Sequence, residues 1–192
     1  CAPVPANPGT GDPASGSWGN VTFGGAGTAV TLTGTQNRLE VGNWGTGTLT
    51  ISNGALVDAA SAPCASGCGA FIGNGAGSTG TLNITGVGSE VRTLGISIGQ
   101  SSVFTNPPNA FVFGTPGGTT NAVVNVLAGG KLTTERATVG SNNGSPNGNG
   151  SEKAFGTLVI DGANSQWLVK NNSLGAAGNQ AAGLTIGNNA GG

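Results

Sequence analysis

Histidine, methionine and tyrosine are absent from this chain of 192 residues, and charged residues make up only 7% of it. Without histidine, a Ser-His-Asp catalytic triad cannot form. Six lysine and arginine residues and a net charge of −1 exclude the basic surface that nucleic acids and anionic membranes attract. No apolar run is long enough for a membrane-spanning helix. We therefore expect no nucleic-acid partner, no direct insertion into a membrane and no cofactor.

Glycine is abundant, at 39 positions. So much glycine is compatible with a disordered chain, but disorder also requires low hydrophobicity and high net charge. Here 36% of the residues are hydrophobic, and β-branched residues cluster at alternating positions, which is typical of half-buried strands. The same glycine and β-branched content disfavours helix. The composition therefore predicts a folded, all-β chain.

One short phrase recurs along the chain: an apolar residue followed by Gly, a turn, and then Gly-Thr-Leu-x-Ile. It occurs within 41–51 and 72–84, with looser copies within 98–126 and 139–160, and a last apolar-Gly pair is Ile186-Gly187. One such unit cannot bury its apolar face alone and must stack on a neighbour. The repetition therefore predicts a solenoid. Because the last pair begins a repeat that is not completed, we expect an excerpt of a longer polypeptide.

Each repeat is predicted to contain three short strands. The first is the Thr-Leu-x-Ile phrase, the second follows a tight Gly or Asn-Gly turn, and the third ends in the apolar-Gly pair. Three strands closed by turns make one coil of a β-helix. We expect an irregular Pro- and Gly-rich lead-in at 1–20, capping strands at 21–40 and solenoid repeats at 41–192 that continue beyond the excerpt. Loops outside the stacked core explain the uneven repeat length, and the expected insertions are 59–69, 101–119, 141–154 and 170–182.

Two kinds of coil alternate, and the turn after the first strand distinguishes them. One kind has Ser-Asn-Gly-Ala at 52–55 and Ala-Gly-Gly-Lys at 128–131. The other has Gly-Val-Gly-Ser at 86–89 and Gly-Ala-Asn-Ser at 162–165. The alternation predicts that the structural unit spans two coils.

Amide residues follow the apolar-Gly pair: Asn43, Asn74, Gln100 and Asn188, with Asn142 one place later in another coil. Amides stacked in register can hydrogen-bond as a ladder along the axis. Alternatively, Asn is present because it tolerates the left-handed backbone of the turn. The sequence leaves both explanations open.

Two of the three cysteines, Cys64 and Cys68, lie in a loop of small residues where their sulfur atoms can meet. A zinc site would need two more ligands, and the chain has no second cysteine pair. We favour a local disulfide between Cys64 and Cys68 over free thiols, and a disulfide implies an oxidising, extracytoplasmic compartment. Cys1 is a lipid-modified N-terminus, a partner for another chain or the boundary of an excised segment.

Few residues are candidates for catalysis. The Gly-x-Gly-x-x-Gly pattern at 75–80 is followed by a strand phrase, whereas a dinucleotide site needs a helix there. A carboxylate pair for sugar hydrolysis remains available from seven acidic residues. Five charged residues lie near the second strand of their coils and define a candidate acidic face: Asp58, Glu90, Glu135, Arg92 and Arg136. We favour the competing interpretation, in which these residues are solvated surface charges.

Aromatic residues are candidates for contact with a partner. Trp44 and the three Phe residues of the longest insertion could bind a sugar or a protein, and the insertion could equally fold over the solenoid flank; these residues are Trp44, Phe104, Phe111 and Phe113. Trp18 is a further candidate. Trp167 replaces the Val of a repeating strand, so we expect it to pack in the core or at the coil edge.

The phrases at 47–55, 72–91 and 156–167 resemble the repeat of bacterial autotransporter passengers, which also occurs in some PEP-CTERM-type surface proteins. The resemblance covers 39–192 and departs from the repeat in the long insertions and at 122–124, where Gly-Thr-Leu is expected. It implies a right-handed parallel β-helix on the outside of a bacterium, usually with a C-terminal translocating barrel. It transfers no catalytic residue.

These observations predict a secreted or surface-displayed β-solenoid with a structural function and no enzymatic activity. The expected functions are adhesion, cell–cell contact, or the building of a biofilm, an extracellular layer or a fibre. Expected partners are further copies of the chain, through solenoid ends or sides, and surface glycans or proteins. The alternatives are a polysaccharide-active enzyme that uses the acidic face, and a glycan-binding module that uses Trp44 or the Phe-rich insertion.

Overall fold

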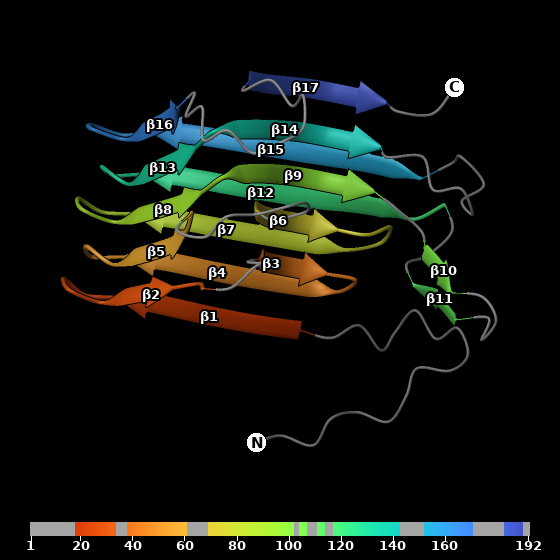
Figure 1. Cartoon of the computed structure of the whole chain (residues 1–192), viewed down its shortest axis with the longest axis horizontal. Coiled ribbons are helices and arrows are strands. Elements are labelled where there is room, and N and C mark those ends of the chain that lie inside the picture. The colour runs from red at the N-terminus through yellow and green to blue at the C-terminus, as the bar shows by residue number, and fades with distance from the viewer. Residues whose placement is uncertain are drawn as a thin grey trace, which may run out of the picture.

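The computed structural model shows three parallel β-sheets wound around one apolar core (Figure 1). It describes residues 18–33, 38–60, 69–101, 104–106, 111–113, 117–142, 152–170 and 183–189. Within these ranges all regular structure is β-strand. The described part of the chain accordingly has no helix of the length and apolar character needed to cross a membrane.

Each sheet takes one strand from each of five coils, in chain order. Sheet A contains β1 (Trp18–Gly24), β4 (Thr46–Ser52), β7 (Thr79–Thr85), β12 (Thr119–Leu127) and β15 (Lys153–Asp161). Sheet B contains β2 (Ala29–Thr31), β5 (Leu56–Ala59), β8 (Glu90–Thr93), β13 (Lys131–Thr134) and β16 (Gln166–Val169). Sheet C contains β3 (Arg38–Asn43), β6 (Gly69–Asn74), β9 (Gly95–Ser101), β14 (Arg136–Asn142) and β17 (Gly183–Asn189).

Coil 1 is therefore β1–β3, coil 2 is β4–β6, coil 3 is β7–β9, coil 4 is β12–β14 and coil 5 is β15–β17 (Figure 1). This is the predicted parallel β-helix with three strands per coil. An antiparallel hairpin, β10 (Phe104–Asn106) and β11 (Phe111–Phe113), is inserted between coils 3 and 4. Coil 1 begins at Trp18, three residues before the capping strands expected at 21–40, and its strands follow the register of coil 2.

Equivalent residues of successive coils lie in columns, because each strand pairs in register with the next. Alternate residues of each strand face inward. Most of these inward residues are apolar, and Thr93 and Thr134 on sheet B are buried polar exceptions. Sheet A contributes the column Val21, Leu49, Leu82, Val124 and Leu158. Sheet C contributes Val41, Ile72, Ile98, Val139 and Ile186. Each buried Leu, Ile or Val adds about 1.5–3 kcal/mol, so one continuous core stabilises the stack.

Sheet B confirms the expectation for Trp167. This residue occupies the inward column of Val57, Val91 and Leu132 and packs against the core. Its indole nitrogen donates a hydrogen bond to Thr134 Oγ1 at 3.0 Å. A Trp is tolerated in a Val column because its N–H finds a partner there.

The glycines of the repeat phrase lie at the corner where sheet C turns into sheet A. A Cβ atom on Gly80 would overlap the backbone nitrogen of Gly73 and the carbonyl oxygen of Val41. Gly73 itself has a left-handed backbone, with φ of 63°. Ala122 stands where the repeat phrase has glycine, and Gly73 of coil 2 lies opposite. A Cβ atom on Gly73 would lie 3.0 Å from the Ala122 Cβ, so Gly73 has to remain glycine. The recurring pair of glycines is therefore a steric requirement of the corner.

The two kinds of coil are coupled through their turns. In coils 1, 3 and 5 a hydroxyl donates to the carbonyl four residues earlier, and these donors are Thr28, Ser89 and Ser165. In coils 2 and 4 the turn is shorter, and the N–H groups of Gly54 and Gly129 each donate to the serine Oγ of the next coil at 3.0 Å. The predicted alternation is thus present, and its physical basis is that one turn supplies the hydrogen-bond partner that the other lacks.

The amide residues form a ladder in part of their column. Asn74 Nδ2 donates to Asn43 Oδ1 at 3.2 Å. The left-handed backbone at this corner is taken by the preceding glycines, such as Gly42 with φ of 70°, so the alternative explanation does not hold for Asn43. A second amide ladder, on sheet A, was not expected: Asn125 Nδ2 donates to Asn83 Oδ1 at 2.9 Å.

Candidate functional site

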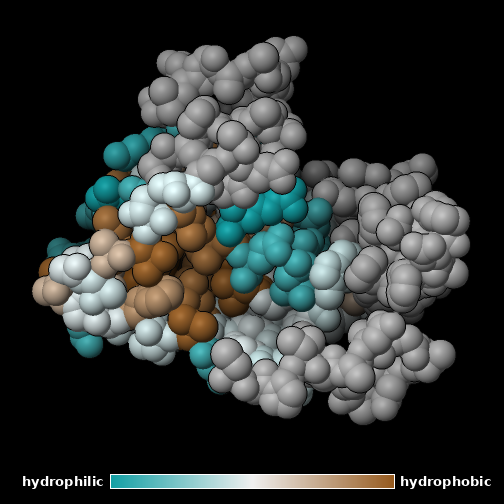
Figure 2. Space-filling view, turned by 60° about the horizontal axis from the view of Figure 1, so that its bottom comes forward, coloured by the Kyte–Doolittle hydropathy of each residue, from teal (hydrophilic) through white to brown (hydrophobic). Residues whose placement is uncertain are grey.

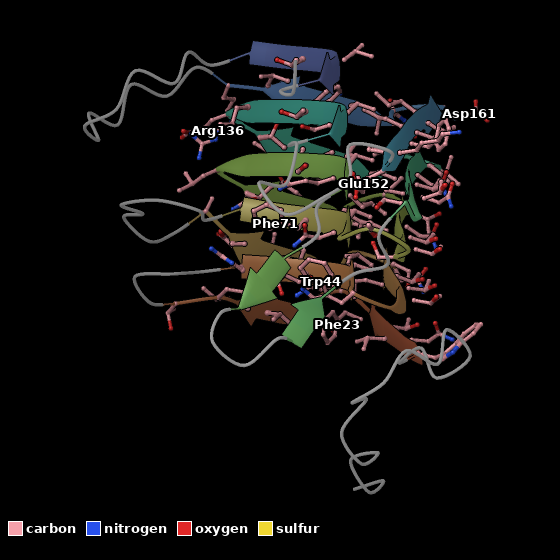
Figure 3. The ribbon with its side chains drawn as sticks, turned by 90° about the vertical axis from the view of Figure 1, so that its right-hand side faces the viewer. Phe23, Trp44, Phe71, Arg136, Glu152 and Asp161 are labelled. Atoms are coloured by element: carbon pink, nitrogen blue, oxygen red, sulfur yellow. The ribbon has the colours of Figure 1, made fainter. Side chains whose placement is uncertain are left out.

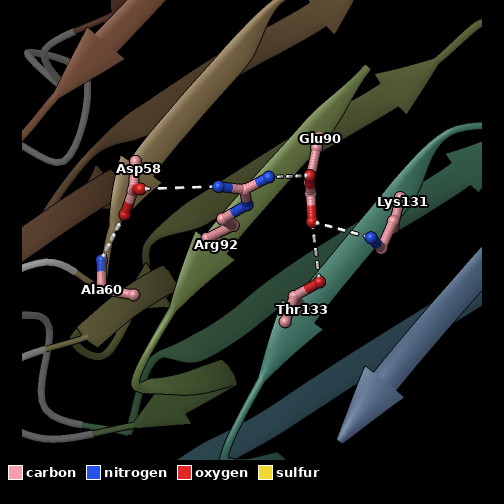
Figure 4. Close-up of polar contacts among 6 residues, drawn as sticks. All are labelled: Asp58, Ala60, Glu90, Arg92, Lys131 and Thr133. Atoms are coloured by element: carbon pink, nitrogen blue, oxygen red, sulfur yellow. Dashed lines mark hydrogen bonds and ion pairs between the residues drawn. The ribbon is translucent and has the colours of Figure 1, made fainter. Parts of the chain in front are cut away.

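The charged residues on the outer face of sheet B form the most connected polar cluster in the described structure (Figure 4). We call it the sheet B charge cluster; it consists of Asp58, Glu90, Arg92, Lys131 and Thr133. These residues alternate with the inward Val57, Val91 and Leu132, which places them on the outer face. Parallel register then sets Arg92 beside Asp58 and Lys131 beside Glu90.

Glu90 is the centre of this cluster. One oxygen, Oε2, accepts a hydrogen bond from Arg92 Nη2 at 2.7 Å. The other, Oε1, accepts from Thr133 Oγ1 at 2.9 Å and lies 3.2 Å from Lys131 Nζ. Arg92 also reaches Asp58, with 3.9 Å between Nη1 and Oδ2. The second Asp58 oxygen accepts the backbone N–H of Ala60 at 2.9 Å.

These contacts hold Glu90 in its ionised form. Partial burial raises the pKa of Glu90, but the hydrogen bonds from Arg92, Thr133 and Lys131 outweigh it and lower the pKa from 4.5 to about 2. The hydrogen bond to Glu90 in turn raises the pKa of Arg92. A carboxylate with so low a pKa carries no proton at neutral pH, so it is a poor general acid.

The candidate acidic face is only partly assembled. The structure joins Asp58 and Glu90 through Arg92, whereas Glu135 lies at the corner between β13 and β14. Arg136 begins β14 in sheet C, and its side chain lies over Gly95 of coil 3. Figure 3 looks along the strands and shows Arg136 and Asp161 on opposite sides of the stack. Two members of the sheet B charge cluster, Lys131 and Thr133, were not among the residues predicted from the sequence. An alignment of Leu132 with Val91 in the repeat would have placed them beside Glu90 and Arg92.

Trp44 packs at the corner between sheets C and A, where the repeat glycines also lie. It has a left-handed backbone, with φ of 56°, which is unfavourable for a bulky residue. Its N–H donates to the Asn74 carbonyl at 2.9 Å, and its half-buried indole lies so close to Gly75 that a Cβ there would overlap the ring. A contact between Trp44 and a partner stays a prediction.

The remaining predicted sites are only partly described. Phe104 pairs with Phe113, and Phe111 with Asn106, in the β10–β11 hairpin; their side chains lie outside the description. Cys64 and Cys68, and with them the predicted disulfide, also lie outside the described residues. Among the residues that are described, no group of three or more acidic or cysteine side chains could hold a metal ion.

The coil 1 end of the stack carries an apolar hollow of about 530 Å³. Its walls include Trp18, Val21, Phe23, Leu39 and Leu49. Figure 2 views this end and shows a hydrophobic surface bordered by polar residues. Trp18 is 81% exposed, so this hollow presents apolar side chains to the surroundings. We call it the coil 1 face.

No protein-family model, curated protein or solved structure matches this chain. The proposals below therefore depend on the residues and their geometry, together with the resemblance of the repeat.

Proposed function

We propose that the chain is a non-catalytic structural protein of a bacterial cell surface, a rigid β-solenoid that supports adhesion, cell–cell contact or an extracellular layer. One observation carries the proposal: five coils share a single register and a continuous core. Stacked coils give a stiff rod because each contacts its neighbours along three sheets. The resemblance to autotransporter passengers and the predicted disulfide support an extracellular location.

The arrangement of the acidic residues also supports a structural function. A glycosidase needs one carboxylic acid with a raised pKa beside a second carboxylate. In the sheet B charge cluster the pKa of Glu90 is instead lowered to about 2, and Arg92 lies between Glu90 and Asp58. The cluster is therefore better suited to linking neighbouring strands through ion pairs than to catalysis.

Beads coated with the chain provide a test. We expect the beads to adhere to one another or to bacterial cells, and the triple variant Asp58→Asn, Glu90→Gln, Glu135→Gln to adhere equally well. The amides keep the shape of the carboxylates, and thermal unfolding followed by circular dichroism checks that the variant folds. Beads coated with the heat-unfolded chain are the negative control.

Two results would contradict the proposal. One is a folded wild-type chain whose beads adhere no better than the unfolded control. The other is cleavage of a polysaccharide by the wild-type chain that the triple variant does not perform.

A further inference from the structure

A polar hollow of about 250 Å³ lies on the side of the stack, over the turns that join sheet A to sheet B in coils 3–5. We call it the turn hollow. Its lining combines residues of the turns with the first residues of the sheet B strands: Gly88, Gly129 and Asn164 from the turns, and Glu90, Lys131 and Gln166 from the strands.

The alternation of the turns explains why a hollow forms there. The turn of coil 4, residues 128–130, is one residue shorter than the turns of coils 3 and 5, residues 86–89 and 162–165, and lies between them (Figure 1). Gly88 and Gly129 bring no side chain into the space. Outward residues of sheet B line the hollow, so it opens to the side of the stack. A coil stacked after coil 5 would extend the columns without covering it.

The fold does not require polar residues in this part of sheet B. The first positions of the five sheet B strands form one outward column, which runs Ala29, Leu56, Glu90, Lys131 and Gln166. Coils 1 and 2 have alanine and leucine there and pair in the same register. The polar residues of coils 3–5 are therefore not a condition of strand pairing, and they give the turn hollow its polar wall.

The polar groups of the turn hollow keep unused hydrogen-bonding capacity. Lys131 Nζ has three protons and directs one to Glu90 Oε1, which lies 3.2 Å away. The Glu90 carboxylate has about four lone-pair sites, and Arg92, Thr133 and Lys131 occupy three of them. The side-chain amides at 164 and 166 form no hydrogen bond with another described residue.

The charges beside the turn hollow are balanced. Two carboxylates, of Asp58 and Glu90, pair with two cations, of Arg92 and Lys131. A charged ligand would gain one attraction and meet one repulsion. A neutral ligand with several hydroxyl groups can donate to the carboxylate and accept from the ammonium group and the amides. The lining therefore favours an uncharged, hydroxyl-rich ligand.

We propose that the turn hollow binds one sugar residue of an uncharged glycan. This inference rests on the proposed surface function and names the class of partner. The volume of the hollow is below the roughly 300–1,000 Å³ of pockets for drug-sized ligands, which limits the contact to a single sugar residue. None of its lining residues is aromatic, so one site binds weakly, with a dissociation constant of about 1 mM or above. Many copies of the chain on one surface compensate through avidity.

NMR titration of the ¹⁵N-labelled chain tests the site. The probes are the methyl glycosides of glucose, galactose, mannose and N-acetylglucosamine. We expect at least one of them to cause saturable shifts of the backbone amide signals of Gly88, Gly129 and Gln166. Sodium galacturonate, an acidic sugar, should bind more weakly, because Glu90 repels it.

Two variants remove one amide each from the turn hollow. Asn164→Gly and Gln166→Ala should each weaken sugar binding about three- to tenfold, as the loss of one hydrogen bond does. Glycine is chosen at position 164 because its φ is 65°, which glycine adopts readily. Asn53→Gly is the matched control: Asn53 is also exposed, has a φ of 53° and lies in the turn of coil 2, so this variant should bind like the wild type. The amide spectrum of each variant shows whether it folds.

The absence of a saturable shift with all four neutral sugars would overturn the inference. So would wild-type affinity in both Asn164→Gly and Gln166→Ala, an equal loss in Asn53→Gly, or tighter binding of galacturonate, which would indicate an anion site. Glu90→Gln keeps an oxygen that accepts a hydroxyl proton, so the adhesion expected of the triple variant is unchanged. The bead test separates the two proposals. Sugar binding by a chain whose beads do not adhere overturns only the scaffold function, whereas adhesion by a chain that binds none of the sugars overturns only the glycan site.

Discussion

At the scale of single residues, steric limits at the corner between sheets C and A are the strongest constraint on the sequence. Gly73 and Gly80 face each other there with no room for a Cβ atom on Gly80. Gly156 is held in the same way by the Ile98 carbonyl and the Gly140 nitrogen. The glycines of the repeat phrase thus allow two sheets to approach closely, which only a residue without a side chain permits.

Gly80→Ala should therefore destabilise the chain. The added methyl group meets backbone atoms that cannot rotate away, so we expect a loss of about 1–3 kcal/mol in the free energy of unfolding. Gly19→Ala is the matched control, because Gly19 occupies the same column in coil 1 and a Cβ atom added there would have no neighbour within 4 Å. Denaturant titration of both variants gives the comparison, and equal losses would argue against the steric explanation.

Glu90 should make stability depend on acid pH. Its folded pKa is lowered to about 2, so its contribution is present in full above the unfolded value of about 4.5 and is lost as the pH falls towards 2. Glu90→Gln should remove this loss and cost about 1 kcal/mol at neutral pH. Thermal unfolding between pH 2 and 7 measures both effects.

Glu135→Gln, outside the sheet B charge cluster, is the control and should keep the wild-type dependence on pH. An unchanged acid dependence in Glu90→Gln would show that other groups dominate the acid response.

At the scale of elements, the turns after the sheet A strands work in pairs. Ser89 accepts the Gly54 N–H of the coil before it and donates to the Thr85 carbonyl of its own coil. This explains why two kinds of turn alternate: the short turn leaves an N–H without a partner in its own coil, and the serine of the next coil supplies one. A chain with the short turn throughout would leave that group unsatisfied.

Ser89→Ala should cost about 1–3 kcal/mol, because Ser89 is fully buried and its loss leaves the partly buried Gly54 N–H unpaired. Ser165→Ala removes the same two bonds in coil 5, where the serine is partly exposed and water can replace them. Ser165→Ala should therefore lower the free energy of unfolding less than Ser89→Ala does. Amide exchange at Gly54 in the Ser89 variant and at Gly129 in the Ser165 variant reports each bond directly, and a greater effect of Ser165→Ala would contradict the pairing described here.

At the scale of the whole molecule, stability should be highest in the middle of the stack. Leu82, Ile84 and Ile98 of coil 3 are fully buried, whereas Ile160 and Ile186 of coil 5 are 45% and 73% exposed. In a stack of repeats each coil is stabilised by its neighbours, so an end coil has half the contacts of an interior one.

Hydrogen exchange measured by mass spectrometry should therefore protect β7–β9 more strongly than β15–β17. Equal protection of all coils would mean that the stack opens as one cooperative unit.

Much of this architecture could be predicted from local pattern. The four insertions expected at 59–69, 101–119, 141–154 and 170–182 agree with the ends of the flanking strands to within two residues. The predictions succeeded because Gly and Asn-Gly turns and period-2 alternation act over a few neighbouring residues. The start of coil 1 was placed too late, since Trp18-Gly19-Asn20 lacks an apolar phrase and is held in β1 by pairing with β4.

By itself, the sequence determined the coil, its three strands and the alternation of its turns, because these depend on contacts between near neighbours in the chain. Only the tertiary structure decided which side chains share a column. Glu90 gains Lys131 and Thr133 from a different coil, and Trp44 is held against Gly75 across a corner. Such contacts depend on the register between coils, and a shift of one residue would turn every side chain to the opposite face.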